Sequence, residues 1–298
     1  MILISGASGL IGSALVHALR SRKCDVKRLV RRRASSPDEV SWYPDRGEID
    51  AQALNGVDAV VNLAGENLSQ RWTTAARRRI RDSRVQATTL LARTIAQSNP
   101  RPRVFVSASA MGIYGTHRDD PIDEGASLGD DFLASVCQEW EAATKPAAAA
   151  GVRVAFSRTG LALARDGGVL AKLLLPFRLG LGGTLGGGRQ WMSWIALTDV
   201  VRALLFMIET ESLAGPVNVV APNPVTNAEF TDTLGRVLGR PTFTIVPAFA
   251  LKLALGQMAE DTALASQRLV PRRLSDAGFQ FELPTLEEAL RRELLLSP

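Results

Sequence analysis

The sequence is poor in the residues that build disulfide frameworks and metal sites. Its 298 residues include two cysteines, Cys24 and Cys137, and two histidines, His17 and His117. So few thiols and imidazoles provide neither a disulfide framework nor the ligand cluster of a zinc site. We therefore expect no metal site and a cytoplasmic location.

The sequence also has no long apolar run, and we expect no secretory leader. No apolar segment reaches the roughly 18 residues that indicate a transmembrane helix. The apolar start of the chain, Met1–Ile4, runs directly into a glycine-rich turn and not into a cleavage site. We expect neither a membrane partner nor secretion.

Lysine is scarce, and most of the basic residues are arginines. The net charge is +5, but only five of the 35 basic residues are lysines, and the arginines are spread along the sequence. Aromatic residues are not interleaved with them as in proteins that bind single-stranded nucleic acid. We therefore expect no nucleic-acid partner.

The first residues contain the strongest positive signal. Met1–Ile4 is a short apolar run typical of a buried parallel strand, and three glycines follow before a segment with helical apolar spacing. Strand, glycine turn and helix open a nucleotide-binding βαβ unit, in which the backbone approaches a pyrophosphate at the helix N-terminus. The residues expected to contact the cofactor here are Gly6, Ser8, Gly9, Leu10, Ile11 and Gly12.

The end of the second expected strand, Asp25–Val30, indicates which cofactor is bound. An NAD-binding fold carries an acid there for the ribose 2′-hydroxyl, whereas arginine accommodates a 2′-phosphate. The strand is followed by Arg31, Arg32 and Arg33. A solvated basic turn is the alternative, but we expect NADP(H), bound by Arg31 and Arg32.

Strands and helices alternate through the first half of the chain, which predicts an α/β fold: a Rossmann-type, doubly wound parallel sheet with a smaller C-terminal substrate lobe. We expect an NADP-binding domain over residues 1–160, completed by a strand near 217–221, and a substrate or lid lobe over 161–298. Within that lobe, about 248–298 forms a family-specific segment. Glycines between 180 and 188 predict a mobile substrate loop, and the acidic, turn-rich segment 119–129 predicts a loop over the crevice.

Small and polar residues end two of the expected strands. Asn62 is followed by Leu63, Ala64 and Gly65, which leave room for a cofactor, and a later strand ends in Ser107–Ser109. The helix expected over 73–98 carries several arginines typical of a solvated face. Arg84 differs, because it lies one turn before the part of the helix in which apolar residues become more frequent. We expect it to contact the cofactor.

Together with the glycine turn, the motifs at 62–67, 80–84, 176–182, 221–227, 271–273 and 284–290 resemble the extended short-chain dehydrogenase/reductases. More narrowly, the chain resembles the YfcH-like NAD-dependent epimerase/dehydratase family over essentially its whole length. The resemblance implies that Ser109 hydrogen-bonds a substrate carbonyl and that Tyr114 lines the substrate site. It also places Ser107 beside the cofactor.

One departure from that family bears on the reaction. Extended members carry Tyr-x-x-x-Lys, in which the Lys lowers the pKa of the Tyr and steadies the nicotinamide ribose. Aligning Glu141 on the acid that follows this motif puts Leu133 at the Tyr position and Cys137 at the Lys position. Ser109 and Tyr114 remain as candidate catalytic residues.

Two functions therefore remain. The first is an NADP-dependent oxidoreductase or epimerase (an isomerase) acting on a small molecule such as a nucleoside-diphosphate sugar, with a homodimer as one expected assembly. The second is a non-catalytic NADP(H)-binding redox sensor. A buried thiol at Cys137 would be core packing, and an accessible one would suit the sensor.

Overall fold

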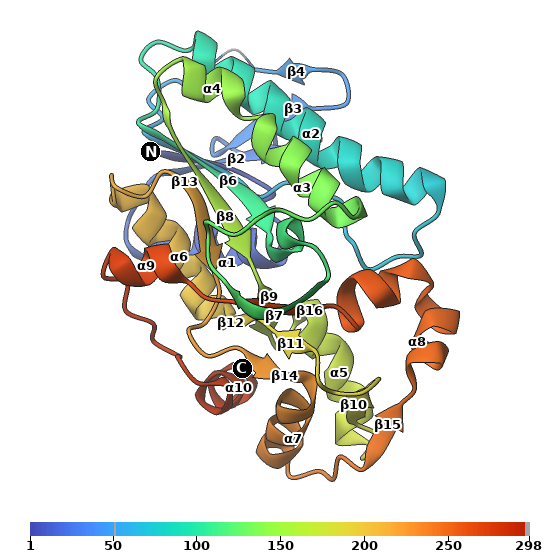
Figure 1. The fold of residues 1–298 in the computed structure, drawn as a ribbon. Helices are drawn as coiled ribbons and strands as arrows, with labels where there is room; N and C mark the ends of the chain where they lie inside the picture. Colours follow the sequence, from blue (N-terminus) through green and yellow to red (C-terminus); the bar gives the residue numbers. More distant parts are fainter. Residues whose placement is uncertain (51, 296–298) are drawn as a thin grey trace. The chain divides into compact units, whose positions relative to one another are not determined.

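Eight strands form the large sheet of this computed structural model, which describes residues 1–50 and 52–295 (Figure 1). In spatial order they are β13 (Gly215–Val219), β8 (Arg153–Thr159), β6 (Val104–Ala110), β5 (Ala59–Asn62), β1 (Ile2–Ser5), β2 (Val26–Val30), β3 (Glu39–Tyr43) and β4 (Glu48–Ile49). β1 pairs in parallel with both β2 and β5, β2 with β3 and β5 with β6 are also parallel pairs, and β3 pairs with β4 in the antiparallel direction. The order of connection reverses at β1, which confirms the predicted Rossmann-type fold.

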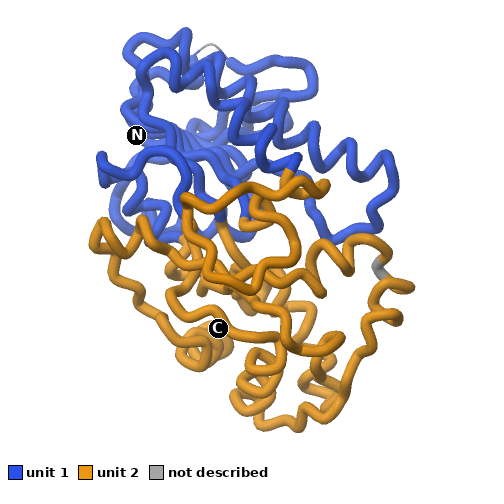
Figure 2. Tube along the Cα trace, in the orientation of Figure 1, with its two compact units in different colours: residues 1–110, 135–158, 201–217 blue, residues 111–134, 159–200, 218–298 orange. Residues whose placement is uncertain are grey.

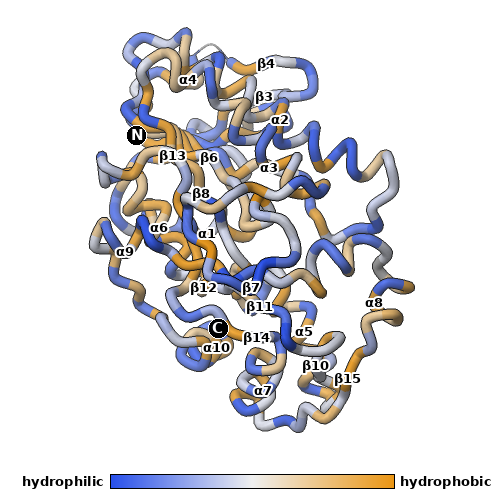
Figure 3. The backbone as a smooth tube through the Cα atoms, viewed as in Figure 1, coloured by the Kyte–Doolittle hydropathy of each residue, from blue (hydrophilic) through white to orange (hydrophobic). Residues whose placement is uncertain are grey.

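The central strands are apolar because helices cover both faces of a parallel sheet. All four residues of β5 are buried, and so are the last three of β1. Figure 3 shows these central strands as hydrophobic and much of helix α2 (Thr74–Gln97) as hydrophilic. This contrast separates buried strand from half-exposed helix along the chain.

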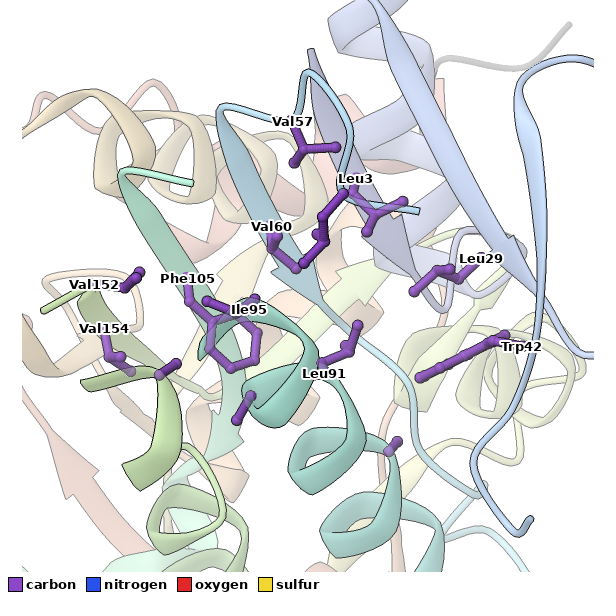
Figure 4. Packing of buried hydrophobic residues seen from close by; sticks show 14 residues of the cluster. Leu3, Leu29, Trp42, Val57, Val60, Leu91, Ile95, Phe105, Val152 and Val154 are labelled. Carbon is purple, nitrogen blue, oxygen red and sulfur yellow. The ribbon is translucent and has the colours of Figure 1, made fainter. Parts of the chain in front are cut away.

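Helix α2 packs on one face of the sheet through a buried apolar cluster (Figure 4). Leu91 and Ile95 of α2 are fully buried beside Leu3, Val60 and Phe105 of the strands. Each such side chain contributes about 1.5–3 kcal/mol relative to leaving it exposed. The helix begins at the predicted place, where the hydroxyl of its N-cap residue accepts a hydrogen bond from the Ala76 backbone N–H.

Most of the remaining helices connect strands, whereas α9 and α10 follow the last strand of the described chain. They are α1 (Leu10–Ser21), α3 (Phe132–Ala142), α4 (Lys145–Ala149), α5 (Gly168–Arg178), α6 (Leu197–Glu209), α7 (Asn227–Leu238), α8 (Ala248–Leu255), α9 (Arg272–Asp276) and α10 (Leu286–Leu295), with a 3-10 turn at Met111–Tyr114 and a π turn at Ala259–Ala263. In Figure 1, α1 lies on the face of the large sheet opposite α2.

Cα packing divides the chain into two units (Figure 2). Unit 1 comprises residues 1–110, 135–158 and 201–217, and unit 2 comprises 111–134, 159–200 and 218–298. Unit 1 thus includes a segment beyond residue 200, and unit 2 includes a segment before residue 135. The expected functional division near residue 160 stays a prediction.

Unit 2 has its own apolar core and four two-stranded sheets. Its core includes Trp194, Phe177, Phe230 and Leu290. The sheets are β10 (Gly183–Leu185) with β15 (Thr244–Val246), β11 (Trp191–Met192) with β14 (Val225–Thr226), β12 (Trp194–Ala196) with β9 (Leu161–Ala164), and β16 (Ser266–Leu269) with β7 (His117–Ile122).

Two segments expected to be loops contain strands. The acidic segment 119–129 begins inside β7, which pairs in parallel with β16, and the glycine-rich segment 180–188 contains β10, which pairs with β15. Their partners lie far along the chain, so no local pattern of apolar residues announces the pairing.

Candidate functional site

The glycine turn between β1 and α1 has the geometry of a diphosphate cradle. Gly6 has φ +68°, and a Cβ there would lie 2.5 Å from the Leu63 carbonyl oxygen. A Cβ on Gly12 would lie 2.1 Å from the Gly6 carbonyl oxygen. These two glycines are therefore required by the close approach of the turn to its neighbours. Gly9 is different, because its Cβ would meet only the Gly6 carbonyl oxygen, at 3.3 Å.

The N-terminus of α1 is open to an anion. Gly9 is the N-cap with extended backbone (φ −76°, ψ 172°), no side chain caps the helix, and its first turn carries no acid. Ser8 and Gly9 are exposed, and Leu10 and Ile11 are half-buried. First-turn N–H groups without side-chain partners favour a negative group such as a pyrophosphate. The turn therefore fits the cofactor predicted from its sequence.

The end of β5 lies beside the end of β1. Ser5 is paired with Asn62 in the parallel register, and the Ser5 hydroxyl donates to Asn62 Oδ1 at 2.6 Å. The Asn62 side-chain amide donates in turn to Thr88 Oγ1 of α2 at 2.7 Å. This buried chain of hydrogen bonds fixes the point at which Leu63, Ala64 and Gly65 leave the sheet. Leu63 and Ala64 are half-buried and Gly65 is exposed at the carboxyl edge.

An acid at the start of β3 binds the basic turn that follows β2. Glu39, at the start of β3, is 4% exposed in its side chain and binds the Arg32 guanidinium through both oxygens, at 2.9 and 2.7 Å. Residues 31–38 fold back and bring β3 beside β2, which places Glu39 against Arg32. No spacing in the sequence signals this return.

Arg31 and Arg32 consequently differ. The Arg32 guanidinium donates hydrogen bonds to Glu39 and to the Ser35 hydroxyl. The hydrogen bonds that Glu39 accepts from Arg32 and from the Ser35 N–H lower the pKa of Glu39 to about 2. Arg31 is exposed, and in the described part of the chain it has neither a hydrogen-bonded nor an ion-paired partner. Of the two predicted phosphate ligands, Arg31 is the available one.

Ser109 and Ser107 end β6 with different surroundings. The Ser109 hydroxyl donates to Glu141 Oε1 at 2.7 Å, and Glu141 is held by Arg158 through hydrogen bonds of 2.9 Å to each carboxylate oxygen. Ser107 is fully buried, with a weak 3.4 Å contact from its hydroxyl to the Ala108 carbonyl. The Ser109 proton is thus engaged by the protein, while its oxygen lone pairs remain acceptors.

The two positions of the missing Tyr and Lys are apolar or neutral. Leu133 and Cys137 both lie on α3 and are 8% and 4% exposed. Burial raises the pKa of the Cys137 thiol to about 12, so the thiol is protonated at neutral pH. Neither side chain can exchange a proton in the way that a Tyr–Lys pair does.

Arg84 reaches from α2 toward α3. Its guanidinium donates to the carbonyls of Ile80 (2.9 Å) and Glu66 (3.1 Å) and lies 5.1 Å above the ring of Trp140. A Cβ on Gly65 would lie 3.1 Å from the Arg84 Cζ. Arg84 therefore sits at the end of β5, among residues predicted to bind the cofactor.

Tyr114 belongs to unit 2. It is 1% exposed, and its hydroxyl donates to Asn218 Oδ1 at 2.7 Å. Its catalytic role stays a prediction.

Among the described residues there is no helix long and apolar enough to cross a membrane and no cluster of metal-ligating side chains.

Comparison with known proteins identifies the family. Residues 2–220 match the NAD dependent epimerase/dehydratase family, and residues 246–293 match a domain of unknown function. An epimerase family protein of Mycobacterium leprae is 48% identical over 291 residues, covering 97% of this chain and 94% of the relative.

Two solved structures are also similar. Human epimerase family protein SDR39U1 (isoform 2), whose crystal structure contains NADPH, is 33% identical with a TM-score of 0.90 and 99% coverage of both chains. A nucleoside-diphosphate sugar epimerase from Corynebacterium glutamicum is 37% identical over 98% of this chain and 57% of that chain, with a TM-score of 0.82. On this similarity, which extends over nearly all of its length, the chain belongs to the NAD dependent epimerase/dehydratase family.

Proposed function

We propose that this protein binds NADP(H) in preference to NAD(H). The observation that carries the proposal is Arg31, an exposed guanidinium without a protein partner in the described chain, at the end of the strand where the ribose 2′-position is read. A guanidinium matches a phosphate in charge and in hydrogen-bond geometry. The NADPH in the structure of the human relative supports the same choice.

For the reaction, we propose oxidoreduction or epimerisation of a small molecule, with nucleoside-diphosphate sugars as the first class to examine. The name of the Corynebacterium relative supports that class. Ser109 is the candidate contact for a substrate oxygen. Since its proton is given to Glu141, it would accept a hydrogen bond from a substrate hydroxyl more readily than donate one to a carbonyl.

A second candidate is a protein that binds NADP(H) without turning over a substrate. Leu133 and the neutral thiol of Cys137, where the family carries its proton-transfer pair, favour it. A redox role for Cys137 itself is disfavoured, because a buried, protonated thiol reacts slowly. We also propose a cytoplasmic location and retain a homodimer as an assembly to be measured.

Calorimetry with NADPH and NADH tests the cofactor. Tighter binding of NADPH is expected, and equal or tighter binding of NADH would overturn the proposal. A panel of nucleoside-diphosphate sugars, ketones and aldehydes, followed by the absorbance of the reduced nicotinamide, then separates the two candidates.

If the panel reveals turnover of a substrate, single variants identify the side chains on which the turnover depends. Ser109→Ala should slow it, Tyr114→Phe tests the second predicted catalytic residue, and Cys137→Ala should leave it unchanged. Loss of turnover in Cys137→Ala alone would instead indicate thiol chemistry.

A further inference from the structure

Arg84 is held in place by neutral groups. Its contacts are two main-chain carbonyls and the face of Trp140, and no carboxylate forms an ion pair with it in the described part of the chain. Other arginines of α2 do have such partners: Arg78 pairs with Asp82, and Arg81 pairs with Glu139. Arg84 is thus a fixed positive charge that no carboxylate of the described residues contacts directly, although the charge of Glu66 acts on it through space.

The guanidinium also has unused donors. Arginine carries five N–H groups, and only two are used in the hydrogen bonds to Ile80 and Glu66. Burial lowers the pKa of Arg84, yet a guanidinium stays charged in proteins. A half-buried cation with spare donors favours a ligand that brings oxygen atoms to it.

Arg84 packs against the face of α3 that carries Cys137. Trp140 lies one helical turn after Cys137, so both side chains project from the same face of the helix. Arg84 contacts the ring of Trp140 on this face, and its charge lowers the pKa of the Cys137 thiol, an effect smaller than the opposing effect of burial. Cys137 is the position at which extended family members carry their Lys.

We infer that Arg84 supplies from α2 the positive charge and the hydrogen-bond donors that the family's Lys supplies from α3, directed at the ribose hydroxyls on the nicotinamide side of the cofactor. This inference rests on the proposed binding of NADP(H). Two features of unit 1 are consistent with this transfer of the positive charge from α3 to α2. Gly65 leaves room for the guanidinium, and the neutral thiol at Cys137 avoids a second cation beside it.

Comparing the binding of two ligands distinguishes a contact of Arg84 with the nicotinamide half of the cofactor from a general loss of cofactor binding. NADPH contains the nicotinamide half, whereas adenosine 2′,5′-bisphosphate contains only the half read by the glycine turn and Arg31. Arg84→Met keeps an unbranched side chain without charge, and Arg84→Lys keeps the charge. The exposed Arg78→Met is the matched control on the same helix.

Arg84→Met should weaken NADPH binding roughly tenfold or more, the loss expected for a charge-assisted hydrogen bond, and leave the bisphosphate unaffected. Arg84→Lys should lose less, and Arg78→Met should bind both ligands as the parent does. Unchanged NADPH affinity in Arg84→Met, or equal losses for both ligands, would overturn the inference. Failure of the parent protein to bind either ligand would instead overturn the proposed function.

A double variant tests the exchange directly. Arg84→Met combined with Cys137→Lys returns the charge to α3, and NADPH affinity should recover relative to Arg84→Met alone. Thermal unfolding identifies whether the double variant is folded. No recovery in a folded double variant would contradict the inference that the two positions serve the same point of the cofactor.

Discussion

The Arg158 guanidinium forms a bidentate ion pair with the Glu141 carboxylate: Nε donates to Oε1 and Nη2 donates to Oε2, each at 2.9 Å. The side chains are only 5% and 11% exposed. Glu141 also accepts the Ser109 hydroxyl, so this pair links α3 and β8 to the end of β6 inside unit 1. The orientation of Ser109 therefore depends on a buried ion pair.

Glu141→Ala should destabilise the protein by about 3–5 kcal/mol, because it leaves the Arg158 charge buried without its main partner. Urea unfolding followed by circular dichroism measures the change. As a control, Glu287→Ala removes an exposed partner of Arg236 and should cost about 0–1 kcal/mol. Similar costs for both variants would show that burial of the Glu141 pair has no energetic consequence.

Gly9→Val should abolish NADP(H) binding and leave the protein folded. A side chain at Gly9 projects over the open N-terminus of α1 and meets only one backbone atom, at 3.3 Å. Gly12→Val is the contrasting variant, because its Cβ would lie 2.1 Å from the Gly6 carbonyl oxygen and should impair folding. Calorimetry and thermal unfolding of both variants distinguish these outcomes; undiminished affinity in folded Gly9→Val would show that Gly9 has no role in binding.

Arg31→Ala should remove most of the preference for NADPH over NADH. A charge-assisted contact to the 2′-phosphate is worth about 1.5–3 kcal/mol, or roughly ten- to a hundredfold in affinity. Arg32→Ala should have the smaller effect, since the Arg32 guanidinium is bound to Glu39. The ratio of the NADPH and NADH dissociation constants is the measurement, and a larger effect of Arg32→Ala would reverse the assignment.

Stability should fall in acid through the turn that follows β2. Hydrogen bonds from Arg28 lower the pKa of Asp38 to about 2, and those from Arg32 do the same for Glu39. Both carboxyls have unfolded pKa values near about 4. Their contribution is therefore complete above that pH and is lost as the pH falls toward about 2.

The urea midpoint measured between neutral pH and acid checks this pH dependence. The double variant Asp38→Asn, Glu39→Gln should be less stable at neutral pH and should lose less stability on acidification. An unchanged slope in the double variant would show that other carboxyls govern the acid transition.

Cys24 and Cys137 should differ in reactivity toward a thiol reagent. Cys24 is exposed, whereas Cys137 is buried and has a pKa raised to about 12. One thiol should therefore react rapidly in the folded protein near pH 8, and the second only after unfolding. Cys24→Ser should remove the rapid phase, and a rapid phase that persists would mean that Cys137 is accessible.

The sequence alone determined the fold class and the cofactor turn. Met1–Ile4, the three glycines and the helical spacing after them are local signals, because each depends on neighbours within a few residues. The same holds for α2, which begins where its sequence predicts, and the N-cap Thr226 and the left-handed Gly239 that bound α7 are local signals of the same kind.

Tertiary structure decided which charged groups are free and which are paired. Glu39 reaches Arg32 because β3 returns beside β2, and Glu141 reaches Ser109 because α3 packs near the end of β6. β7 pairs with β16, although about half of the chain separates the two strands in the sequence. These contacts join residues that share no local pattern, and a side chain's partner depends on the packing of the backbones that carry it. The availability of Arg31 and the fixed charge of Arg84 therefore follow from the fold and cannot be read from the order of the residues.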